Sequence, residues 1–482
     1  MSELKEKESQ EEGWTRDEEA ALVKKLDWKL MPFAMCLFTA ALLDRNNYGN
    51  ARVLNQNTDR GLENELGMHG YDYQLSVSIF FVTYVLCEVP SNMLLKKFTP
   101  RVWFTRIMVT WGIISACQGA CSNLAGIIVC RLLIGVAEAS LLPGLILWIS
   151  FWYKPFEIAF RTALIHCNVS IAGAFTGLLA TAIGQMHLVG GLSAWRWVFI
   201  LEGIPSLVLS VITFIFLPDY PHTSTFLSER EKDIAIRRLP PTAPSHLDKD
   251  IDKSHFRAIL TDPMNLIHPL SYGITILPQS SLSYFLPTIL LGMGFSGTMS
   301  NLMSVWPNLW AGCFEIWCGF HGDKTQERAL HIAIPSIFSM LGWILVPVGG
   351  KNGWPVGLRY FFVFFCTTGI GGAPGWFSWR QNMLSGSTQN AVVLAWINTV
   401  CNAFGAVAPF LFPSSAGPNY EVGGAICAAC WAASILGCGV VYMYDRTRRK
   451  NGFYRDMEEA SRRELDKLNE MYKRAEETKE AV

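Results

Sequence analysis

The chain has 482 residues, of which 50% are hydrophobic and 17% charged, and its mean hydropathy is +0.24. A soluble globular chain carries about 25% charged residues, so this composition excludes an ordinary soluble protein of several domains. Lysine plus arginine and aspartate plus glutamate both number 40, so the net charge by itself says nothing about partners. Nucleic-acid binding has no support, because the placement of the basic residues follows membrane topology. The 13 cysteines lie mainly in apolar segments without metal-ligand spacing, so we expect no metal or other cofactor.

Long apolar runs follow one another along the chain, and each is long enough to span a bilayer as a helix of about 20 residues. The sequence therefore predicts an all-α membrane protein with twelve transmembrane helices. The predicted spans are 29–49, 73–95, 102–121, 124–149, 162–185, 196–217, 264–291, 300–320, 329–349, 357–379, 389–412 and 422–444.

The polar segments divide these spans into two pseudo-symmetric six-helix halves, 29–217 and 264–444. The central loop 218–263 contains Ser228-Glu-Arg-Glu231, a capping-box pattern that predicts a short surface helix. The terminal segments 1–28 and 445–482 are charged, and the first lacks the apolar core of a signal peptide, so we expect both to be cytoplasmic tails.

Lysine and arginine placement fixes the predicted orientation. With both termini inside, 33 of the 40 basic residues fall on the cytoplasmic side. At the opposite face lie only Arg52, Arg60, Lys351 and Arg359. The basic residues therefore follow membrane topology, with the lipid bilayer as the predicted surroundings.

The segment after the eighth span reads Gly319-Phe-His-Gly-Asp323-Lys324-Thr-Gln-Glu-Arg328. It resembles the G-x-x-x-D-[RK]-x-x-x-[RK] loop of the major facilitator superfamily, and this resemblance implies a gating role for Gly319, Asp323, Lys324 and Arg328. Internal repetition is common among transporters. The segment after the second span keeps the basic residues but lacks the aspartate.

Ionisable residues inside the spans are the strongest functional signal, because each costs about 2.5–3.5 kcal/mol at the bilayer centre. Arg131 and Glu138 are seven residues apart, so they lie on one helix face about 10.5 Å apart along the axis. Asp44 and Arg45 lie at a similar depth in the first span. Arginines can bind a carboxylate with two hydrogen bonds, and carboxylates in a low-dielectric cavity can carry protons. The pattern is typical of a proton-coupled anion site.

A second interpretation is that Asp44–Arg45 and Arg131–Glu138 only neutralise each other and fix helix packing. Near the ends of other spans, Glu88, Glu202 and Glu315 favour a structural role. Further candidates for substrate binding, or else for hydrogen bonds between helices, are Tyr48, His166, Asn168, Tyr284 and Asn398.

Several segments resemble the anion:cation symporter branch of the major facilitator superfamily and, within it, the fungal allantoate permease group. They are Leu43-Asp-Arg-Asn-Asn-Tyr-Gly-Asn-Ala51, Glu88-Val-Pro-Ser-Asn92, Arg131-Leu-Leu-Ile-Gly-Val-Ala-Glu-Ala139, Trp195-Arg-Trp-Val-Phe-Ile-Leu-Glu-Gly203 and Leu217-Pro-Asp-Tyr-Pro221.

This resemblance implies proton coupling by Asp44 and Glu138 and binding of the substrate's anionic group by Arg45 and Arg131. It also implies import of a small organic anion, such as the allantoate, nicotinate, pantothenate or biotin carried across the group. The expected location is the plasma membrane, with a vacuolar or other internal membrane as the alternative, and the expected state is a monomer. Asn47-Tyr48 departs from the usual Asn-Ile pair, so substrate identity is open.

Two alternatives remain. Proton-driven efflux by antiport usually carries a proline-containing signature in the fifth span, where this chain reads Ala172-Gly-Ala-Phe-Thr-Gly177. A nutrient receptor with a transporter fold would differ only in transport itself. The sequence contains no H-E-x-x-H, P-loop or nucleophile elbow, so we do not expect an enzyme.

Overall fold

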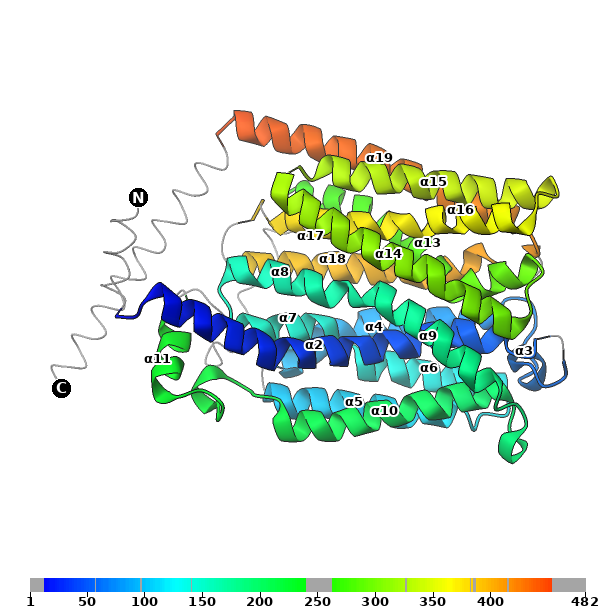
Figure 1. Ribbon diagram of the computed structural model, residues 1–482, viewed down its shortest axis with the longest axis horizontal. Coiled ribbons are helices and arrows are strands. Elements are labelled where there is room, and N and C mark those ends of the chain that lie inside the picture. The colour runs from blue at the N-terminus through cyan, green and yellow to red at the C-terminus, as the bar shows by residue number, and fades with distance from the viewer. Residues whose placement is uncertain are drawn as a thin grey trace.

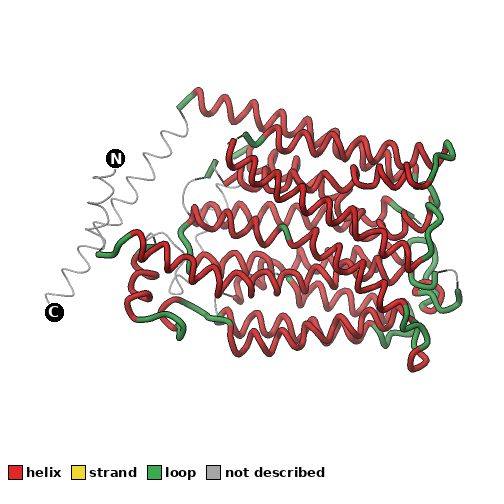
Figure 2. Tube along the Cα trace, viewed as in Figure 1, coloured by secondary structure: helices red, strands yellow, loops and turns green. Residues whose placement is uncertain are grey.

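The computed structural model describes residues 13–56, 58–95, 98–139, 141–239, 262–325, 327–381, 383–384, 387–413 and 416–452. Figure 2 shows helices and connecting loops, and no strand, over this part of the chain. Each of the twelve predicted spans coincides with helical structure there, so the predicted fold class is confirmed.

The first six spans are formed by eight helices: α2 (Arg16–Val53), α4 (Asp72–Leu95), α5 (Pro100–Gln118), α6 (Leu124–Glu138), α7 (Leu141–Ser150), α8 (Pro155–His166), α9 (Asn168–Gly184) and α10 (Ala194–Phe216). Short elements connect them: α3 (Leu62–Glu65), η1 (Val189–Gly191), η2 (Pro221–Thr223) and α11 (Glu229–Arg237).

The last six spans are α13 (Met264–Gly292), α14 (Gly297–Thr325), α15 (Ala329–Lys351), α16 (Val356–Thr368) with η3 (Gly369–Gly372) and α17 (Ala373–Gln381), α18 (Ser387–Val407) with η4 (Ala408–Leu411), and α19 (Glu421–Lys450).

The helices run roughly parallel to one long axis (Figure 1). We call the end where α2 begins the α11 side, and the opposite end the α3 side. Between the halves, α9 packs on α14, α4 on α18 and α2 on α13. The interface between the two halves is therefore formed in large part by these six helices.

The outer faces of the bundle are apolar. Of the helices in the described residues, eight are long and apolar enough to cross a membrane by themselves. On α10, for example, Val208, Val211, Phe214 and Ile215 are exposed. In a bilayer such a surface contacts lipid, while each helix satisfies its own backbone hydrogen bonds. The protein is a multi-pass membrane protein.

Local sequence explains where several helices begin, and two helices extend beyond the predicted spans. The first helix begins at Arg16, inside the predicted tail, because Thr15 and Glu18 form a capping box and Leu22 and Leu26 are buried. Ser228 and Glu231 form the predicted capping box at the start of α11, which confirms that surface helix. The segment predicted as a loop after the eighth span is helical as far as Thr325.

The fourth and fifth spans, predicted as continuous helices, are each interrupted. After Glu138 the backbone of Ala139 is extended, with φ −50° and ψ 131°, so α6 ends there. Ser91 Oγ donates to the Ala139 carbonyl at 2.8 Å and satisfies one of the backbone groups that the break frees. The fifth span is divided into α8 and α9 at Cys167, although the backbone of Cys167 keeps helical angles of φ −56° and ψ −20°.

Candidate transport site

A cavity of about 210 Å³ lies between the two halves. Its wall includes Arg45 on α2, His166 at the end of α8, Asn308 on α14 and Asn398 on α18, together with Gln279 and Tyr284 on α13. Both halves therefore contribute polar side chains to one cavity.

Arg45 is the arginine that reaches this cavity. Its Nη2 lies 2.6 Å and its Nε 2.9 Å from Oε1 of Glu138 on α6. Its guanidinium also lies over the rings of Phe80 and Tyr84, at 5.1 and 5.0 Å. Glu138 Oε2 is buried and has no partner among the described residues. Arg45 and Glu138 thus form an ion pair between two helices at the edge of the cavity.

This pairing differs from the one considered in the sequence. Asp44 does not neutralise Arg45, because it points to the other side of α2, where Ser115 of α5 donates to its Oδ1. Arg131 does not pair with Glu138 either. The packing of α6 turns the side chain of Glu138 toward α2. The spacing of Arg131 and Glu138 along α6 does not determine which residue of a neighbouring helix each of them contacts.

Arg131 lies behind the cavity wall. Its guanidinium carbon is 3.9 Å from the ring centroid of Tyr48, and its Nε and Nη2 are buried without a partner in the described part of the chain. Tyr48 is held by a 2.6 Å hydrogen bond with Ser76 and by stacking on Tyr73 at 5.1 Å. This arrangement places a buried positive charge with two free donors next to the Arg45–Glu138 pair.

Close approach of α4 and α6 positions Glu138. A Cβ at Gly135 would lie 2.0 Å from Thr83 Oγ1 and 2.5 Å from the Phe80 carbonyl oxygen. Only glycine fits at this crossing, so α6 is held against α4 within one turn of Glu138.

Three further predicted binding residues have distinct surroundings. His166 Nδ1 lies 3.0 Å from Glu315 Oε1 on α14, across the interface between the halves. Asn398 Nδ2 donates to Glu88 Oε1 at 2.6 Å, also across the interface. Asn168 does not line the cavity, because its amide donates to the carbonyls of Leu164 and Ile165 at the break in the fifth span.

The structure also identifies a buried carboxylate for which the sequence predicted only a structural role. Glu202 on α10 is buried, and neither of its oxygens has a partner among the described residues. It is an electrostatic neighbour of Asp44. Its charge within an apolar span was the available signal, but its position near a span end pointed to a structural role.

On the α3 side the two halves close over the cavity. A Cβ at Gly49 would lie 2.5 Å from the Tyr284 carbonyl oxygen, and one at Gly297 would lie 2.2 Å from that of Val53. Gln74 Nε2 also donates to the Phe412 carbonyl at 3.1 Å. The two halves are therefore in close contact on the α3 side.

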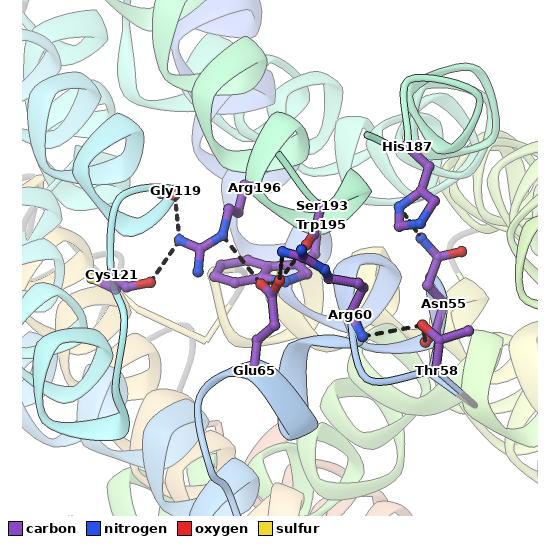
Figure 3. A network of polar contacts seen from close by, with 10 residues as sticks. All are labelled: Asn55, Thr58, Arg60, Glu65, Gly119, Cys121, His187, Ser193, Trp195 and Arg196. Atoms are coloured by element: carbon purple, nitrogen blue, oxygen red, sulfur yellow. Dashed lines mark hydrogen bonds and ion pairs between the residues drawn. The ribbon is translucent and has the colours of Figure 1, made fainter. Parts of the chain in front are cut away.

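The loops of the N-terminal half on that side are tied together by Glu65 of α3 (Figure 3). Its carboxylate accepts from Ser193 Oγ at 2.5 Å, Trp195 Nε1 at 2.8 Å and Arg196 Nε at 3.2 Å. Arg196 Nη1 in turn donates to the carbonyls of Gly119 and Cys121, at 2.9 and 2.7 Å. We call this set of contacts the Glu65 clasp.

The motif residues lie on the α11 side. Gly319 faces Pro374, and Lys324 is exposed in the last turn of α14. Arg328 is the N-cap residue of α15 (Ala329–Lys351), directly before the helix begins. The side chain of Asp323 lies outside the described part of the structure, so the predicted gating role of the motif stays a prediction.

A bundle of two helical halves around a central polar cavity is the architecture of a secondary transporter. The sequence profile of the Major Facilitator Superfamily matches residues 34–409. The chain is 39% identical over 334 residues to the MFS transporter prlL of Fungal sp. (strain NRRL 50135), covering 69% of this chain and 68% of that protein. It is 30% identical over 396 residues to the "Putative tartrate transporter" of Agrobacterium vitis, covering 82% and 85%.

Solved structures agree on the fold. A bacterial homologue of the human lysosomal transporter Spinster, inward-facing and unoccupied, aligns with a TM-score of 0.64 at 14% identity, over 87% of this chain and 97% of that one. The xylose transporter XylE from E. coli, partially occluded and inward open, aligns with a TM-score of 0.64 at 12% identity, over 86% and 97%. The chain belongs to the Major Facilitator Superfamily and is a membrane transporter, not an enzyme.

Proposed function

We propose that this transporter is a proton-coupled symporter that imports a small organic anion carrying a carboxylate. The observation that carries the proposal is the Arg45–Glu138 ion pair at the cavity, with Nη2 and Oε1 2.6 Å apart. The guanidinium of Arg45 is already bound by the carboxylate of Glu138. It can therefore bind a substrate carboxylate only after the ion pair with Glu138 has broken.

Protonation of Glu138 provides that release. A neutral carboxylic acid no longer attracts the guanidinium as an ion, so Arg45 becomes free to make two parallel hydrogen bonds to a substrate carboxylate. Conversely, loss of the proton returns Glu138 to Arg45 and expels the anion. Proton and anion therefore bind together and leave together, which is the thermodynamic condition for symport.

The surrounding charges support this cycle. Arg131, with two buried donors that have no partner among the described residues, is the second cation that attracts the anion. Asp44, whose Oδ2 is likewise buried and unpartnered there, is the second proton carrier. Tyr48 fixes Arg131 through the 3.9 Å contact with its guanidinium.

The rest of the cavity indicates the kind of molecule that fits. Gln279, Ser283, Asn308 and Asn398 line the half opposite the arginines, and all are neutral. They suit the hydroxyl or amide groups of a compact polar anion. A relative whose name includes tartrate is consistent with such a substrate. Further parts of the proposal are both termini in the cytoplasm, the plasma membrane as location, a monomer and no cofactor.

The first test is uptake of a panel of labelled carboxylates by cells expressing the protein, with and without a protonophore. Uptake of the true substrate rises as the external pH falls from about 7 to about 5, because protons are a co-substrate. Uptake that is indifferent to pH and protonophore contradicts proton symport.

The second test is Glu138→Gln in proteoliposomes. Glutamine keeps the volume of a protonated glutamate but cannot release a proton, so counterflow exchange persists while accumulation driven by a pH gradient is lost. If exchange and accumulation are both lost at normal expression, Glu138 is a binding or structural residue. If both persist, Glu138 has no part in coupling.

A further inference from the structure

Two buried glutamates occupy equivalent positions in the two halves. Glu88 and Glu315 each lie 13 residues before an arginine, Arg101 and Arg328 respectively, in the matching segments that follow the second and eighth spans. Their relative exposures are 1% and 0%. Internal repeats of this kind place equivalent residues on opposite flanks of a central cavity.

Each glutamate bonds to the other half of the protein. On one flank, Glu88 of α4 accepts from Asn398 Nδ2 at 2.6 Å and from Thr399 Oγ1 at 3.3 Å, both on α18. On the other flank, Glu315 of α14 contacts His166 Nδ1 at 3.0 Å and accepts from Ser170 Oγ at 3.4 Å. The two halves are thus connected through a buried carboxylate on either side of the cavity.

The chemistry of the two flanks differs. Glu88 is bonded by an amide and a hydroxyl, which do not titrate, whereas Glu315 faces an imidazole, which does. The other titratable groups in electrostatic range of Glu315 are Cys167 between α8 and α9, Tyr272 on α13 and Cys318 on α14. From α17, the phenyl ring of Phe377 lies 5.6 Å from the imidazole, between ring centroids. Within the described residues no lysine or arginine forms an ion pair with Glu315.

We propose that His166 and Glu315 together bind one proton, as a further proton site of the transporter besides the proposed carriers Glu138 and Asp44, and that this site also holds the two halves in contact. With that proton the pair is neutral overall and joined by a hydrogen bond. Without it, a buried carboxylate faces a neutral imidazole and has no compensating cation, which is a strongly unfavourable state in a low-dielectric interior.

The position of His166 allows the proton to exchange and the contact to open. Its side chain is 18% exposed and lines the cavity, so water in the cavity can deliver the proton. It also lies at the end of α8, directly before Cys167 and α9, the helix that packs on α14. Loss of the proton therefore weakens the packing of α9 on α14 at its polar contact.

The test is the melting temperature of the purified full-length protein at pH 6 and pH 8, measured without substrate and without a gradient. We expect wild type to melt about 2 degrees or more lower at pH 8 than at pH 6, because the pair loses its proton. In Glu315→Gln and in His166→Gln this difference disappears, since neither variant can form the pair. The matched control is Glu88→Gln, which removes the equivalent carboxylate and keeps the wild-type difference.

A spectroscopic measurement accompanies the melting curves. Infrared difference spectra between the two pH values should show carboxyl or imidazole bands in wild type and Glu88→Gln that both His166→Gln and Glu315→Gln lack. The proposal is overturned if His166→Gln retains the wild-type bands or if either variant of the pair retains the wild-type melting difference. Because no transport is measured, such a result leaves the assignment of Glu138 untouched, and failure of the Glu138→Gln test leaves this pair untouched.

Discussion

At the scale of single residues, the two arginines of the site, Arg45 and Arg131, differ in whether a carboxylate pairs with them. Arg45 is bound by Glu138 at 2.6 Å, whereas Arg131 contacts the face of Tyr48 and keeps two buried donors without a partner in the described structure. A planar guanidinium can stack on an aromatic ring and present parallel donors at the same time, and an ammonium cannot.

Arg131→Lys therefore lowers uptake at least about tenfold, although the charge is kept, which corresponds to about 1.4 kcal/mol of lost binding. The measurement is the concentration dependence of uptake at equal surface expression. Arg60→Lys is the control, because Arg60 is an exposed loop residue with 56% of its side chain accessible. Wild-type transport by Arg131→Lys would remove Arg131 from substrate binding.

Sequence spacing located the charged residues but not their partners. Asp44, Arg45, Arg131 and Glu138 all stand out as charges in apolar spans, and the structure gathers them around α2 and α6. That Arg45 rather than Arg131 binds Glu138 depends on how far two helices are rotated about their axes. Tertiary packing determines that rotation, and a single helical wheel does not contain it.

At the scale of elements, the crossing of α4 and α6 is the tightest constraint near the site. Gly135→Ala places a methyl group where Thr83 Oγ1 already lies, 2.0 Å away, so the helices must separate. We expect a loss of about 1–3 kcal/mol, typical of overpacking, seen as a lower melting temperature and weaker uptake. Gly439→Ala on α19 is the control, since its added Cβ meets nothing within 4 Å.

Hydropathy predicted the number and order of the membrane spans. Each span is a run of apolar residues, because a helix in lipid satisfies its backbone polar groups by its own hydrogen bonds. Hydropathy could not predict the interruptions at Ala139 and Cys167, which lie inside apolar runs. The free carbonyl at Ala139 is satisfied by Ser91 from another helix, and the break at Cys167 uses Asn168 as a local donor. Hydrophobicity alone does not predict these side-chain hydrogen bonds to backbone carbonyls.

At the scale of the whole molecule, ion pairs between side chains connect α11 and the start of α2 to the N-terminal half. Arg238 is buried and lies 3.4 Å from Glu19 and 3.1 Å from Glu157, while Lys154 lies 2.6 Å from Glu19. Burial alone would raise the pKa of Glu19, but Lys154 and Arg238 hold that pKa below its usual value of 4.5. The stabilisation is therefore present above pH 4.5 and is lost as the pH falls below it.

Arg238→Ala leaves two carboxylates facing each other without their buried partner. We expect the free energy of unfolding to fall by on the order of 3 kcal/mol at pH 7, and the loss to shrink in acid as the carboxylates become protonated. Melting curves at pH 7 and pH 4 measure both effects. Arg446→Ala, an exposed site on α19, is the control. A loss that is the same at both pH values contradicts an ionic origin.

The Glu65 clasp joins loops of the N-terminal half alone. The carboxylate of Glu65 contacts residues 60, 193, 195 and 196, and Arg196 reaches the loop at 119–121. Nothing in that set belongs to the half that must tilt against it during transport. The surface over the clasp should therefore keep one shape through the whole cycle. An antibody fragment raised against this surface would bind the transporter in every conformation. It could therefore serve as a fiducial marker for imaging without stopping transport.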